Sequence, residues 1–172
     1  MPPIGFSAAT VLDEVKAGAT LQSVADAHSM DEIAGAVRDA LTGLRLGVSS
    51  LDEAALHRVA GLELWSIAEI AGHVLKMDEA AHAIARSLAI GQRPNVIVPY
   101  GEAGAATATR EDLLAGVRVA EERLAATRVL AGGGPTYAHD ELGELSARGW
   151  ILFIALHAAA HLHQAAAVVR AR

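Results

Sequence analysis

The chain of 172 residues contains no cysteine, and this absence removes several classes of chemistry. Disulfide bonds, thiolate zinc sites and a cysteine nucleophile are all excluded, so any bound metal must be held by His, Asp or Glu. A chain of this length can still bury a substantial core as one domain without disulfides to stabilise it.

Positive charge is also scarce. Lys and Arg number 14 against 20 Asp and Glu, and the formal net charge is −6, so we predict no nucleic-acid partner. The amino terminus lacks the basic region and apolar run of a secretion signal, and we expect a cytoplasmic protein. Residues 150–169 carry no formal charge, but three histidines and a glutamine interrupt this run, which argues against a membrane span.

The sequence shows no persuasive strand pairing, because the apolar stretch at 96–98 is short and flanked by prolines. We therefore expect negligible sheet content. Signals for helix starts are explicit: Ser29, Ser50 and Ser66 each precede a glutamate by three residues, which is the spacing of the capping box.

Two further residues are candidate helix caps. Thr109 precedes acidic residues that suit the first turn of a helix, and Ser146 can cap the final helix. Together with the apolar periodicity, these signals predict a short helix and four long ones. The long helices are expected at 30–46, 66–90, 110–130 and 147–170, and the short one at 51–59.

These elements predict an all-α fold, a four-helix bundle with a long crossover connection. Residues 91–104 contain two prolines and three glycines, so we assign them to the crossover, and a second break lies at 132–135. Residues 8–28 resemble one or two extra short helices broken at Gly18. We therefore divide the chain into an N-terminal helical extension, 1–28, and the bundle, 29–172.

Histidines in two of the predicted helices are candidate metal ligands. His157 and His161 lie four residues apart, so on a helix their imidazoles are stacked one turn above the other. His73 shares a helix face with apolar residues and is a candidate third ligand. On the same helical wheels, His163 turns away from the pair and His82 lies opposite His73, so we expect both to be outside the site and His82 to be exposed.

Three neutral imidazoles on two helices suit a catalytic metal, because they leave coordination positions open for water or substrate. The alternative is that these histidines are ordinary hydrogen-bonded core residues, since helical spacing alone supplies only the pair. Glu69 lies one turn before His73, but it is better explained as the partner of Ser66 in the capping box. The chain has no HExxH glutamate, which disfavours a zincin-type protease.

The segment from Trp65 to His73 resembles the W-S-x-x-E-x-x-x-H signature of the DinB/YfiT-like metalloenzyme superfamily. The segment from His157 to Gln164 resembles the closing H-x-x-x-H-x-x-Q helix of that family. The resemblance extends over about residues 30–170 and implies a four-helix bundle, often dimeric. It also implies that His73, His157 and His161 bind a divalent transition metal, zinc or nickel.

Characterised members of the family include thiol S-transferases that use bacillithiol, mycothiol or glutathione. The resemblance therefore implies a metal-dependent enzyme in which the metal activates a low-molecular-weight thiol that attacks a small-molecule electrophile. The alternatives are a metal-dependent hydrolase and a non-catalytic dimeric bundle that binds a metal or a small ligand. The loop around Tyr100 and Glu102 is a candidate for the mouth of the pocket, although a long connection that needs Gly and Pro for its path explains these residues equally well. We expect a homodimer and no membrane partner.

Overall fold

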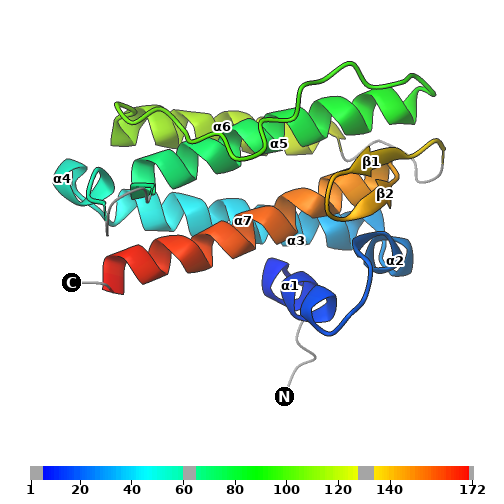
Figure 1. Cartoon of the computed structure of the whole chain (residues 1–172), viewed down its shortest axis with the longest axis horizontal. Helices are drawn as coiled ribbons and strands as arrows, with labels where there is room; N and C mark the ends of the chain where they lie inside the picture. The colour runs from blue at the N-terminus through cyan, green and yellow to red at the C-terminus, as the bar shows by residue number, and fades with distance from the viewer. Residues whose placement is uncertain (1–5, 60–64, 128–133, 171–172) are drawn as a thin grey trace.

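The computed structural model describes residues 6–59, 65–127 and 134–170. Four long helices form its body, as the sequence predicted. Short helices precede the bundle or join its members, and one hairpin lies beside the last helix (Figure 1). The elements are α1 Ala8–Lys16, α2 Leu21–Ala27, α3 Met30–Ser49, α4 Glu53–Leu56, α5 Ile67–Ala89, α6 Arg110–Thr127, β1 Tyr137–His139, β2 Gly143–Leu145 and α7 Ala147–Arg170.

The long helices form a closed ring around one core. Helices α3 and α5 each contact both α6 and α7, so the order around the bundle is α3, α7, α5 and α6. The two chain-adjacent helices α5 and α6 are joined by the predicted crossover, which runs back along α5 (Figure 1). Because each long helix has two neighbours in the ring, it can bury side chains on two of its faces.

The predicted helix starts are mostly confirmed. Ser29 and Ser66 close complete capping boxes with Glu32 and Glu69, and Thr109 forms the same reciprocal pair with Asp112. Ser50 instead ends α3, which runs a turn beyond the predicted end at 46. The predicted end of α6 at 130, and the first half of the break at 132–135, lie outside the described residues.

The last helix, α7, packs against four other helices and against β2. Its first half is buried against α3 and α5, and α1 and α2 pack on it from outside the ring. By length and composition α7 could cross a membrane, but 44% of its apolar window is buried inside the protein. The buried residues of α7 lie in its first half, from Ala147 to Ala159, and their burial accounts for the apolar character of that half.

A short hairpin was not anticipated from the sequence. Strands β1 and β2 pair antiparallel, with Tyr137 opposite Leu145 and His139 opposite Gly143. The pattern was missed because each strand has only three residues and no clear alternation. The hairpin is held on α7 by a side-chain hydrogen bond. The indole Nε1–H of Trp150 in α7 donates to the backbone carbonyl of Tyr137 in β1, at 3.1 Å.

The prediction that His82 is exposed was wrong, because its side chain is fully buried. The helical wheel placed it correctly on the face of α5 opposite His73. That face is covered by α6, and Arg123 of α6 reaches the Asp78 carboxylate beside His82. A wheel gives the direction of a side chain but cannot say whether another helix lies there.

Candidate metal centre

Three imidazoles converge between α5 and α7. His73 comes from α5, and His157 and His161 lie one turn apart on α7. One ring nitrogen from each lies within 4.8 Å of the other two. The ring centroids are 4.4 Å apart for His157 and His161 and 4.9 Å for the other two pairs. The fold therefore brings together the three histidines that the sequence analysis singled out.

The ring of His73 is fixed by the crossover. Its Nδ1 lies 2.7 Å from the backbone carbonyl of Glu102, which can only accept, so Nδ1 carries the proton. The other nitrogen, Nε2, faces Nε2 of His157 at 3.1 Å. A carbonyl partner on the far nitrogen is the usual way to orient a metal-binding imidazole.

The ring of His161 is fixed from its own helix. Its Nδ1 lies 2.8 Å from Oε1 of Gln164, three residues further along α7, so this ring also donates from Nδ1 and leaves Nε2 free to bind. Trp65 packs on the outer side of the group, 4.9 Å from the ring of His73 and 6.3 Å from that of His161. Gln164 and Trp65, both parts of the sequence signatures, thus contact the candidate ligands directly.

The pKa of each imidazole is lowered from its usual 6.5, chiefly by burial. The effect is largest at His157, whose pKa falls to about 2 because burial is reinforced by repulsion from His161 and His73. The hydrogen bonds to Glu102 and Gln164 act in the opposite direction on their own rings. All three rings are therefore neutral at neutral pH and present lone pairs, which is the form that metals bind.

Two glycines allow the crossover to lie directly on α5. Gly72 precedes His73, and a Cβ at this position would lie 2.8 Å from Cα of Gly104. The reverse is equally tight, since a Cβ on Gly104 would lie 2.7 Å from the carbonyl oxygen of Glu69. That same carbonyl accepts from the N–H of Gly104 at 2.9 Å. This close approach is what places the Glu102 carbonyl on His73.

A pocket of about 380 Å³ opens against the three imidazoles. The crossover, the hairpin turn and α7 enclose it, and Met77, Phe153 and Leu156 form an apolar wall. Tyr100, Asp140 and Glu141 form a polar rim. Tyr100 of the crossover lies in this lining, whereas Glu102 contributes its backbone carbonyl to His73.

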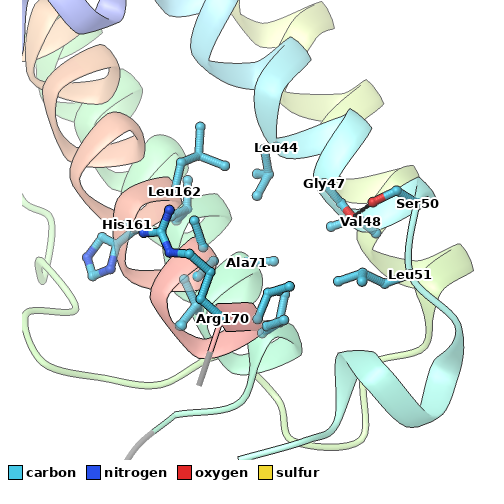
Figure 2. Close-up of a pocket in the computed structure, with 15 residues that line it drawn as sticks. Leu44, Gly47, Val48, Ser50, Leu51, Ala71, His161, Leu162 and Arg170 are labelled. Atoms are coloured by element: carbon cyan, nitrogen blue, oxygen red, sulfur yellow. Dashed lines mark hydrogen bonds between the residues drawn. The ribbon is translucent and has the colours of Figure 1, made fainter. Parts of the chain in front are cut away.

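A second pocket, of about 350 Å³, lies between α3, α5 and α7. Figure 2 shows its largely apolar walls, which include Leu44, Val48 and Leu162, and Arg170 lying across it. His161 stands at the edge of this pocket, but its ring points away (Figure 2). The ring of His161 is therefore directed away from this pocket, and it lines the first pocket together with His73 and His157.

Two further predictions about polar residues agree with the structure, and one residue of the pocket was missed. His163 is exposed on α7, as expected, and Glu69 serves the capping box, with Oε2 2.8 Å from the N–H of Ser66. The sequence analysis assigned no role to His139, yet this residue is buried and lines the same pocket as the three histidines. No spacing rule links it to them, because it reaches the pocket through the unforeseen hairpin.

Comparisons with known proteins agree with the fold and the motifs. A family model described as the DinB superfamily matches residues 35–165. A solved structure described as "Crystal structure of TT2238, a four-helix bundle protein" is similar, with a TM-score of 0.65 and 22% identity over 81% of this chain and 99% of that one. At that identity the likeness concerns the fold. No curated protein matches the chain.

Proposed function

The chain belongs to the DinB superfamily, and from that premise we propose that it is an enzyme that uses a low-molecular-weight thiol. His73, His157 and His161 bind one divalent transition metal, zinc or nickel, beside the pocket that receives the substrate. The observation that carries the proposal is the convergence of three neutral imidazoles, two of them with fixed tautomers, at the wall of a pocket.

The donor set fits a cation. With Nδ1 of His73 engaged by Glu102, Nε2 of this ring presents a lone pair toward Nε2 of His157 at 3.1 Å. Two imidazole nitrogens that share one zinc ion lie about 3.3 Å apart, given Zn–N bonds of about 2.0–2.1 Å. The third nitrogen lies within 4.8 Å of these two, so only a small side-chain rotation separates the three from a ligand set.

When bound, such a metal lowers the pKa of a thiol or a water molecule in its open coordination positions. The chain contributes the rest. Three uncharged ligands leave the full charge of the cation unneutralised, and Glu102 and Gln164 hold two of the rings in place. The apolar wall of Met77, Phe153 and Leu156 provides a surface for the apolar part of a substrate.

Elemental analysis of protein purified without a polyhistidine tag tests the metal site. We expect about one equivalent of a transition metal per chain, lost in a His157→Ala/His161→Ala double variant, because a single remaining imidazole is a weak ligand. His163→Ala is the matched control, since His163 lies on the same helix but is exposed. Equal metal content in the double variant and the control would contradict the assignment.

A thiol-consumption assay tests the reaction. Bacillithiol, mycothiol and glutathione are each incubated with chlorodinitrobenzene: the sulfur–carbon bond forms, chloride leaves and the thiol proton passes to solvent. We expect consumption of at least one thiol that depends on the metal and is lost in the double variant. Metal-dependent ester hydrolysis without thiol consumption would favour the hydrolase, and neither activity would favour a binding protein.

The proposal includes two further expectations, a homodimer and a cytoplasmic location. Light scattering on the purified protein measures the first, and a mass of one chain at micromolar concentration would contradict it. Fractionation of the source cells measures the second. Neither result bears on the metal site, because all three ligands come from one chain.

A further inference from the structure

A fourth histidine faces the pocket from the hairpin. His139 is the last residue of β1, its side chain is 7% exposed, and it lines the pocket together with the three converging histidines. Phe153 connects the two, since its ring centroid lies 4.7 Å from that of His139 and 5.2 Å from that of His157. His139 is therefore next to the candidate metal centre without being part of it.

The hairpin turn determines which nitrogen of His139 carries its proton. The backbone N–H groups of Glu141 and Leu142 both donate to Nδ1, at 3.1 and 3.4 Å. Nδ1 must then be the acceptor, so the neutral ring is protonated on Nε2. Burial lowers the pKa of His139, which favours this neutral form, although Asp140 and Glu141 oppose the effect.

The Nε2–H of His139 is a buried donor for which no acceptor lies within hydrogen-bond distance among the described residues. A buried donor left without an acceptor costs about 1–3 kcal/mol, and native proteins seldom retain one without a reason. The rings of Tyr100, Trp150 and Phe153 pack around the imidazole. None of these aromatic rings supplies a strong hydrogen-bond acceptor.

Of those three rings only one is partly exposed. Trp150 and Phe153 are buried in α7, whereas Tyr100 lies on the crossover and is 36% exposed. The ring of Tyr100 stands edge-on to His139, with centroids 5.0 Å apart. Tyr100 also lines the pocket, so a ligand that displaced this partly exposed ring would lie next to the His139 imidazole.

We propose that His139 donates its Nε2–H to an uncharged carbonyl oxygen of the small molecule that occupies this pocket. The inference rests on the proposed function in that the pocket is the substrate site. For the metal-free protein the acceptor is assigned as neutral, because the pocket lining then has no cationic side chain and the carboxylates of Asp140 and Glu141 lie at its rim. The apolar part of the ligand contacts Met77, Phe153 and Leu156. His139 is thus a positioning residue for the electrophile.

The first test is spectroscopic and uses the unmodified sequence. NMR of the full chain with isotope-labelled histidine should show His139 as the Nε2–H tautomer. Acetophenone, an apolar probe with one carbonyl acceptor, should shift that proton downfield, whereas toluene, which has no acceptor, should not. An Nδ1–H tautomer, or no response to acetophenone at millimolar concentration, would overturn the proposal.

The second test uses His139→Phe, which keeps an aromatic ring but removes the donor. We expect about a fivefold to tenfold loss of acetophenone affinity, the usual effect of one neutral hydrogen bond, and no change for toluene. An equal loss for both probes would mean that His139 acts only by packing, and benzoate binding more tightly than acetophenone to metal-free protein would overturn the neutral class. If the variant does not fold, the NMR result on the unmodified chain decides.

The same titrations on as-purified and chelator-treated protein separate this inference from the proposed function. The donor belongs to the hairpin, so acetophenone should bind both forms in a His139-dependent manner. Metal content should be the same in His139→Phe and the unmodified chain. A metal-free protein that still binds acetophenone through His139 would contradict the metal site alone.

Discussion

Helix α5 carries one buried histidine on each of two opposite faces, and their surroundings differ sharply. His73 faces two neutral imidazoles and an open pocket. His82 belongs to a charged cluster, which we define as Asp78, His82 and Arg123, sealed between α5 and α6. Its Nδ1 lies 3.0 Å from the carbonyl oxygen of Asp78 on its own helix, and its Nε2 has no partner among the described residues.

These surroundings distinguish a candidate binding site from buried polar groups that only stabilise the fold. In the charged cluster, the Asp78 carboxylate is already matched by a cation, Arg123, and no pocket described here reaches it. In the three-histidine group, three neutral imidazoles converge, and no carboxylate is paired with them. Opposite charges that are paired hold helices together, whereas converging neutral donors are suited to a ligand.

The largest effect should come from breaking the charged cluster. Arg123→Ala leaves the fully buried Asp78 carboxylate without its cation and should lower the free energy of unfolding by about 3–5 kcal/mol. Urea denaturation measures this loss, and metal content per folded chain should not change. Arg118→Ala, an exposed position on the same helix, is the control. Stability equal to that of the control would mean that the cluster is not structural.

Gly72→Ala should act on the other face of α5. The added Cβ would lie 2.8 Å from Cα of Gly104, so the crossover must move and the Glu102 carbonyl leaves His73. We expect about a 10- to 100-fold loss of metal affinity, which is typical for removal of a group that orients a ligand. Competition with a chromogenic chelator measures the affinity.

The matched control for that substitution is Gly35→Ala on α3. A Cβ at Gly35 meets nothing within 4 Å, so this change should leave metal affinity as it is. It should also raise stability by about 0.5–1 kcal/mol, because alanine is the better helix former. Metal affinity that falls equally in both variants would contradict the role given to the crossover.

The pH dependence of stability should report on the burial of His157 in the three-histidine group. Because the pKa of His157 is lowered to about 2 in the folded chain, the unfolded chain binds more protons below its pKa of about 6.5. Stability is therefore complete above about pH 6.5 and falls with acid, by about 1.4 kcal/mol per pH unit for such a group. Urea denaturation of metal-free protein between about pH 7 and pH 5 should show a shallower slope in His157→Leu. Equal slopes would contradict burial of this ring in its neutral form.

The smallest effect should come from Gln164→Leu. This change removes the acceptor of the His161 Nδ1–H, but Gln164 is exposed and water can replace it, so the loss of metal affinity should not exceed about tenfold. His163→Leu, one position earlier, should have no effect on affinity. A loss larger than that in Gly72→Ala would reverse our ranking of the two supports.

Much of the architecture could be predicted because its signals are local. The serine–glutamate boxes at Ser29 and Ser66 satisfy backbone groups within four residues, and the spacing of His157 and His161 requires only one helical turn. The hairpin and the burial of His82 could not be predicted in this way. Each depends on which element covers a given face, and that is settled by packing between segments distant in the chain.

By itself, the sequence determined where most helices begin, which face of each is apolar and which three histidines are candidates for one site. The tertiary structure alone decided what surrounds them: the crossover carbonyl of Glu102 on His73, made possible by the contact of Gly72 with Gly104, and the hairpin that brings His139 to the pocket. The two differ in the distance along the chain between the residues that interact. Caps and helical faces arise from neighbours a turn apart, whereas a pocket is made by side chains and carbonyls that meet only when the bundle closes.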